Sequence, residues 1–120
     1  MYPELASLVA KTSGLREVLV KALEGAKGVR VAFVFGSLAR GVGQAASDVD
    51  LMVIGEIGLR AIAPRLRPAI NSIGREINPV VMSPAGFSSK IKGGDAFLRN
   101  VMAAEKLFIV GGPDELAEMG

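Results

Sequence analysis

Apolar residues recur along the chain with two spacings, which predict an alternation of helices and strands. From Leu15 to Ala26 the apolar positions follow the i, i+3, i+4 spacing of an amphipathic helix that ends at Gly25 or Gly28. The runs Val29 to Phe35 and Asp48 to Ile54 are short, rich in β-branched or apolar residues, and followed by glycine, as is typical of buried strands.

The connection between these two strands determines their relative direction. Residues 36–47 can hold one helical turn and a glycine-rich bend, which is too short for a parallel crossover with its helix. We therefore expect antiparallel neighbours, with the end of the first strand beside the start of the second.

The second half of the chain predicts further helices and strands. Pro64 and Pro68 interrupt the helical pattern of Leu59 to Ile73 and favour a bent helix or two short pieces. Ser83 and Asp95 are typical N-cap residues of later helices. The remaining expected elements are strands at Arg75 to Met82 and Leu107 to Val110, and helices from Pro84 to about Lys90 and from Ala96 to Ala104. This order predicts an α/β fold with a small mixed β-sheet and flanking helices.

Length and composition fit one domain. The chain has 120 residues, of which 50% are hydrophobic. We assign residues 1–12 to a lead-in segment or linker remnant and residues 13–120 to the domain. Val31 to Ala39, the longest uncharged apolar run, is too short to span a bilayer, and the N-terminus lacks the pattern of a signal peptide. We therefore expect a cytoplasmic protein that folds alone or as a small oligomer.

The chain contains no Cys and no His, which excludes Ser-His-Asp and Cys-His catalysis, disulfides and Cys/His zinc sites. A catalytic metal ion would have oxygen ligands, which favour magnesium or manganese, and a general base would be a carboxylate or, less often, Lys or Tyr. The net charge of +2 is too small to imply nucleic-acid binding.

Other residue groups have two interpretations. Between Ile57 and Lys92 six basic residues stand against one acid, a net charge of +5, which indicates either solvated helix faces or a surface facing a polyphosphate. Lys90, Lys92 and Arg99 either line an acceptor site or form a solvated helix face. The phenylalanines expected in the core are Phe33, Phe35, Phe97 and Phe108.

Two aspartates on the second strand give the strongest chemical signal. Asp48 and Asp50 are two residues apart, so their carboxylates leave the same strand face with Cα atoms roughly 6.5 Å apart. Two acids so close repel each other unless a cation joins them, which makes the pair a clamp for one or two divalent metal ions. Gly36 and Ser37, at the end of the neighbouring strand, would present backbone amides and a hydroxyl to phosphates. Arg40 would either contact a phosphate or pair on the surface.

A two-part motif therefore joins the strands: Gly36-Ser37 with Arg40-Gly41, and Ser47-Asp48-x-Asp50-Leu51. It resembles the signature of the DNA polymerase beta-like nucleotidyltransferase superfamily, especially its small single-domain bacterial and archaeal members. The resemblance covers about Val29 to Gly55, and more loosely extends to Val110. It implies that the glycine and serine bind the phosphates of a nucleotide, that the two aspartates bind magnesium, and that a third carboxylate on a later strand completes the metal site.

The third carboxylate is where this sequence departs from the family pattern. The strand from Arg75 contains no Asp, and Glu76 is the only acid between Glu56 and Asp95. Either Glu76 serves as the third metal ligand, or Asn78 has replaced the carboxylate and the site is impaired. We favour Glu76, for which pairing with a nearby arginine is the structural alternative.

The flanks of the motif resemble one branch of the superfamily, in which this domain follows a winged-helix DNA-binding domain. That resemblance rests on Tyr2-Pro3-Glu4-Leu5, Lys11-Thr12-x-Gly14-Leu15 and Arg75-Glu76-Ile77-Asn78-Pro79. The present chain has no recognition-helix pattern and no aromatic stacking platform for nucleic acid, so we do not expect it to bind nucleic acid directly.

These observations predict a metal-dependent nucleotidyltransferase. It would transfer a nucleoside monophosphate from a nucleoside triphosphate such as ATP to an acceptor hydroxyl, which can belong to another protein, with Mg²⁺ or Mn²⁺ held by Asp48, Asp50 and Glu76. The alternative is a catalytically weak nucleotide-binding regulatory or antitoxin-like module that works with a partner protein or a DNA-binding domain.

Overall fold

The computed structural model describes residues 14–35 and 49–119. Residues 14–23 are helical. The elements that follow are β1 (Val29–Phe35), β2 (Val49–Gly55), α2 (Leu59–Ile73), β3 (Ile77–Met82), α3 (Pro84–Lys92), α4 (Ala96–Ala103), β4 (Lys106–Val110) and α5 (Pro113–Met119).

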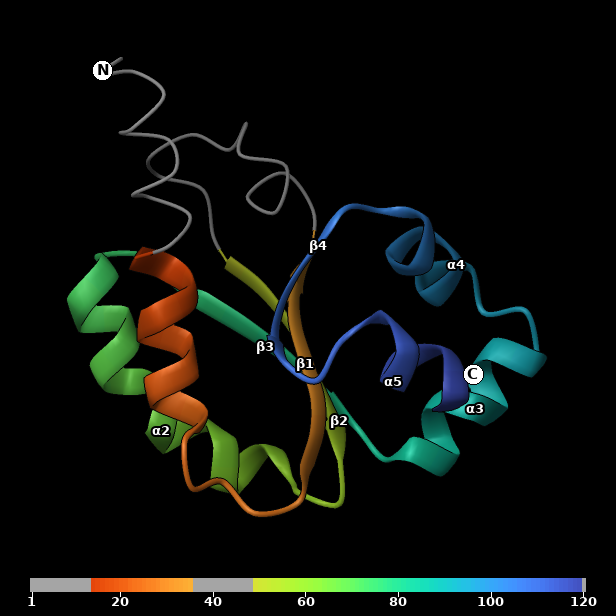
Figure 1. Ribbon diagram of the computed structural model, residues 1–120, viewed down its shortest axis with the longest axis horizontal. Coiled ribbons are helices and arrows are strands. Elements are labelled where there is room, and N and C mark those ends of the chain that lie inside the picture. The colour runs from red at the N-terminus through yellow and green to blue at the C-terminus, as the bar shows by residue number, and fades with distance from the viewer. Residues whose placement is uncertain (1–13, 36–48, 120) are drawn as a thin grey trace.

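These described strands form one sheet in the order β3-β2-β1-β4 (Figure 1). Strand β1 runs antiparallel to both β2 and β4, whereas β2 and β3 are parallel. The predicted antiparallel pairing of the first two strands and the mixed α/β fold are therefore confirmed.

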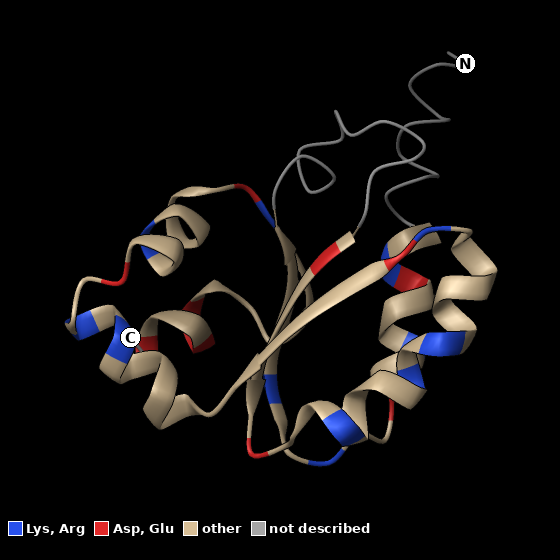
Figure 2. Cartoon of the chain, turned by 180° about the vertical axis from the view of Figure 1, so that it is seen from behind, with Lys and Arg blue, Asp and Glu red and all other residues tan. Residues whose placement is uncertain are grey.

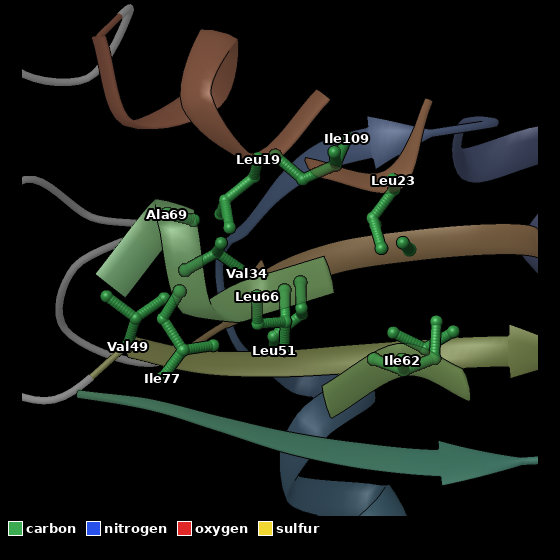
Figure 3. Packing of buried hydrophobic residues seen from close by; sticks show 12 residues of the cluster. Leu19, Leu23, Val34, Val49, Leu51, Ile62, Leu66, Ala69, Ile77 and Ile109 are labelled. Atoms are coloured by element: carbon green, nitrogen blue, oxygen red, sulfur yellow. The ribbon is translucent and has the colours of Figure 1, made fainter. Parts of the chain in front are cut away.

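Helices cover both faces of the sheet (Figure 1). Because successive side chains of a strand point to opposite faces, β1 supplies Ala32 and Val34 to one buried cluster and Val31 and Phe33 to the other. The first cluster lies under the helix at residues 14–23 and α2, and the second lies under α3, α4 and α5. Figure 3 shows the first cluster, in which Leu19, Leu66 and Leu51 meet between the helices and the sheet.

Helix α2 is continuous through Pro64 and Pro68, which excludes two short pieces and leaves the single helix of the two predicted forms. Each proline removes one backbone hydrogen bond, but Leu66 and Ala69 are buried against the sheet, and this packing stabilises the helix. The helix ends at Gly74 with φ 71°, in the left-handed region that glycine adopts most easily.

The predicted helix caps are confirmed. The Ser83 side chain accepts a hydrogen bond from the backbone N–H of Gly86, and the Asp95 carboxylate accepts one from Leu98 at 3.0 Å. Each cap fixes where its helix begins, and the start of α4 matters for the site described below.

Helix α5 is absent from the sequence-based prediction. Its signals are Pro113 at the first position and the acidic residues Asp114 and Glu115 in the first turn. Its length of 7 residues leaves too little periodicity to detect, and Leu116 supplies its buried contact. Within residues 14–35 and 49–119, no helix has the length and hydropathy that crossing a membrane requires.

Candidate functional site

Four register partners cross the sheet where β1 ends and β2 begins. Asn78 of β3 pairs with Asp50 of β2, Asp50 pairs with Phe35 of β1, and Phe35 pairs with Lys106 of β4. We call these four residues the end row. Since paired residues share a sheet face and Phe35 packs against the second cluster, the end row lies on the face covered by α3, α4 and α5.

Asp50 and Asn78 are the oxygen-bearing members of the end row. Asp50 is half-buried between the fully buried Val49 and Leu51, which point to the opposite face, while Asn78 is exposed. Adjacent strands lie about 4.8 Å apart, so the two side chains start from neighbouring Cα atoms on one face. Carboxylate and amide oxygens are ligands that hard divalent cations accept.

Glu76 lies directly before β3. Its backbone carbonyl accepts a hydrogen bond from the N–H of Val49 at 2.9 Å, which continues the parallel ladder. Its side chain is exposed, and it stands two residues before Asn78 and next to the buried Ile77. A strand spacing of about 4.8 Å and a two-residue rise of about 6.6 Å place its Cα roughly 8 Å from that of Asp50.

The other predicted site residues, Gly36, Ser37, Arg40 and Asp48, lie outside the described residues. Among the residues that are described, no group of three or more acids is close enough to hold a metal ion. The choice between Glu76 and Asn78 for the third ligand therefore stays a prediction.

Lys106, at the other end of the row, binds the last turn of α4. Its Nζ donates hydrogen bonds to the carbonyls of Met102 at 2.7 Å and Ala104 at 2.9 Å. Burial lowers the pKa of Lys106, and the nearby charge of Glu105 opposes this shift. Lys106 is not among the site residues predicted from the sequence, where its only signal is a charged position at the start of an apolar strand.

Four phenylalanines continue the end row as a chain of ring contacts. The Phe97 ring packs edge-on against Phe35 with centroids 6.0 Å apart, and Phe33 contacts both Phe35 at 6.2 Å and Phe108 at 5.4 Å. Phe33 is fully buried, as predicted. The prediction of a core position is wrong for Phe97, which is 45% exposed on α4.

Basic residues lie mainly on the outer sides of helices and in loops, and the strands are largely uncharged (Figure 2). In the stretch from Ile57 to Lys92, most of the basic side chains are exposed. Arg65 donates hydrogen bonds to the carbonyls of Glu24 and Gly25, away from the end row. This distribution favours solvated helix faces over a polyphosphate surface for these residues.

Comparison with known proteins agrees with the fold and the motif. The family model described as polymerase beta, nucleotidyltransferase matches residues 17–67, which include the whole two-part motif and end before Glu76 and Asn78. No curated protein matches the chain.

Solved structures with the same fold include toxin-antitoxin proteins. A chain in the structure of a toxin-antitoxin with AMP-PNP superimposes with a TM-score of 0.58 and 13% identity, over 87% of this chain and 79% of that one. A chain from a mutant of the toxin-antitoxin MntA-HpeT gives a TM-score of 0.63 at 11% identity with the same coverage. At these identities the likeness concerns the fold, and neither structure tests the fusion to a winged-helix domain. The motif match and the shared fold together confirm that this chain resembles the polymerase beta-like nucleotidyltransferases.

Proposed function

We propose that the chain is a metal-dependent nucleotidyltransferase that transfers a nucleoside monophosphate from a nucleoside triphosphate to an acceptor hydroxyl. The observation that supports this most is the end row, which sets the carboxylate of Asp50 beside the last residue of β1, directly before Gly36 and Ser37. A triphosphate bound at this corner would lie next to the acidic group that can hold its metal ion.

The reaction requires few protein groups. The acceptor oxygen forms a bond to the α-phosphorus, the bond from that phosphorus to the bridging oxygen of the β-phosphate breaks, and pyrophosphate leaves. Asp48 and Asp50 would hold magnesium or manganese, and the bound ion would neutralise the negative charge of the triphosphate. Glu76 would accept the proton of the acceptor hydroxyl, since it has an exposed carboxylate directly before β3.

The acceptor is proposed to belong to another protein. The support for this is that two solved structures with the same fold are of toxin-antitoxin proteins. A nucleoside triphosphate as substrate fits the AMP-PNP in one of them.

A second function is favoured by one specific observation. Asn78, an amide, occupies the register position beside Asp50 where a further carboxylate would strengthen metal binding. The chain would then be a catalytically weak nucleotide-binding module of an antitoxin-like or regulatory kind. It would bind a nucleotide and a partner without transferring a nucleotidyl group.

Labelled nucleotides distinguish the two functions. The protein is incubated with α-labelled nucleoside triphosphates, magnesium or manganese, and cell lysate, and both labelled product and bound nucleotide are measured. We expect labelled product, reduced about a hundredfold or more by Asp48→Ala or Asp50→Asn. The matched control is Glu56→Gln, an exposed carboxylate just after the far end of β2. Saturable binding without product would favour the second function, and unchanged transfer by both aspartate variants would refute the mechanism.

A further inference from the structure

Phe97 is the most exposed aromatic ring among the described residues, and its position has no structural explanation in the core. It is 45% exposed, whereas its neighbour Leu98 is fully buried in the second cluster. An exposed phenylalanine is common on protein surfaces, but this ring contacts Phe35, the register partner of Asp50.

Asp50 and Phe97 are linked through Phe35. The Cα atoms of Asp50 and its register partner Phe35 lie about 5 Å apart, and the ring centroids of Phe35 and Phe97 lie 6.0 Å apart. A nucleotide whose phosphates meet a metal ion at Asp50 therefore has its base within reach of the Phe97 ring. Phe35, between the two, presents an apolar surface along the same path.

The helix that carries Phe97 is anchored at both ends. Asp95 caps the start of α4, Leu98 and Val101 anchor the helix in the core, and Lys106 binds the carbonyls at its end. These contacts fix α4 at both ends against the face that holds the end row. The backbone that carries the ring is therefore ordered before a flat ligand stacks on it, and the ring itself contacts Phe35.

We propose that Phe97, supported by Phe35, forms the stacking platform for the nucleobase of the nucleoside triphosphate. This proposal rests on the function proposed above. Every base has an apolar π-face, and base-aromatic stacking tolerates changes of base. The platform therefore selects for the presence of a base and prefers the larger purines, with ATP and GTP binding within a few-fold of each other.

Affinity measurements on the full chain separate the base from the phosphates. Mg-ATP and Mg-tripolyphosphate are titrated calorimetrically into wild type, Phe97→Ala and the control Leu59→Ala. Leu59 suits the control because it is 52% exposed on α2, over the opposite face of the sheet. Phe97→Ala should weaken ATP binding about tenfold and leave tripolyphosphate binding unchanged, and Leu59→Ala should alter neither. Equal ATP affinity in wild type and Phe97→Ala, or an equal loss for both ligands, would overturn the platform.

A fluorescent variant keeps the test decisive if Phe97→Ala folds poorly. The chain contains no tryptophan, so Phe97→Trp introduces a single indole that can still stack. ATP should quench its emission and tripolyphosphate should not, while Leu59→Trp should respond to neither. Absence of quenching at saturating ATP would show that the base lies elsewhere, and a response of Phe97→Trp only to a partner protein would identify the ring as a protein contact instead.

The proposed function and the platform can fail separately. Base-dependent binding through Phe97 without nucleotidyl transfer would support the platform and contradict the transferase. Transfer that is insensitive to Phe97→Ala at subsaturating ATP would support the transferase and overturn the platform. A wild-type protein that binds no Mg-ATP would refute both.

Discussion

Replacing Asn78 with aspartate would place a second carboxylate directly beside Asp50. The two positions are register partners in a parallel pair, so the charges would lie about 5 Å apart. Coulomb's law gives a repulsion of about 0.8 kcal/mol at the dielectric constant of water and about 3 kcal/mol at an effective value of 20. Because Asp50 is half-buried and position 78 is exposed, we expect Asn78→Asp to lower the free energy of unfolding by about 1 to 2 kcal/mol in metal-free, low-salt buffer.

The assay is thermal unfolding of wild type and Asn78→Asp with EDTA and with increasing magnesium. A loss of about 1 to 2 kcal/mol corresponds to a melting temperature lower by roughly 4 to 10 °C. Magnesium should reverse this loss, because an ion bound only by the folded state adds RT ln(1 + [L]/Kd) to its stability. Sodium chloride at high concentration should also reduce the difference in melting temperature between wild type and Asn78→Asp, because it screens the two charges.

Asn100→Asp is the matched control, since Asn100 is exposed on α4 and outside the end row. It makes the same chemical change and should leave both the melting temperature and the response to magnesium close to those of wild type. If Asn78→Asp melts at the wild-type temperature in EDTA, or gains no more from magnesium than wild type does, the argument that position 78 and Asp50 share one cation site is refuted.

Two further predictions concern the fold around the site. A Cβ atom at Gly55 would lie 1.9 Å from the carbonyl oxygen of Gly28, so Gly55→Ala should lower the free energy of unfolding by about 3 kcal/mol, as measured by urea denaturation. A Cβ atom at Gly58 meets no atom within 4 Å, so the control Gly58→Ala should change this free energy by less than about 1 kcal/mol. Burial lowers the pKa of Lys106 below its ordinary 10.5. Just below pH 10.5 the unfolded chain therefore binds more protons than the folded one, and the free energy of unfolding of wild type should rise with pH. Lys106→Met should remove this rise, and an equal dependence of the unfolding free energy on pH in both proteins between pH 8 and 10.5 would contradict the lowered pKa.

Local patterns in the sequence predict most of the fold. The bounds of β1 match its apolar run, and Ser83 and Asp95 cap the helices that follow them, because each signal acts within a few residues. Helix α2 has the predicted bounds and stays continuous for a tertiary reason: burial of Leu66 and neighbouring residues outweighs the two prolines. Helix α5 is too short for its periodicity to be recognised.

The candidate site is less predictable because it depends on contacts between distant segments. The pairing of Asp50 with Asn78 follows from the register of two parallel strands separated by a whole helix, and no local pattern determines that register. The same holds for Lys106, which belongs to the end row through β4, and for Phe97 of α4, which contacts Phe35 in that row. The sequence identifies the acidic motif, but the fold decides which side chains surround it.

The proposed function requires that Asp50 helps to hold a divalent metal ion to which a nucleotide binds. Anomalous diffraction from crystals soaked with manganese and a nucleoside triphosphate would locate this ion. We expect a manganese peak within ligand distance of the Asp50 carboxylate, with the phosphates beside it and either Glu76 or Asn78 as a further ligand. Manganese bound elsewhere, or a nucleotide bound away from the end row, would contradict it.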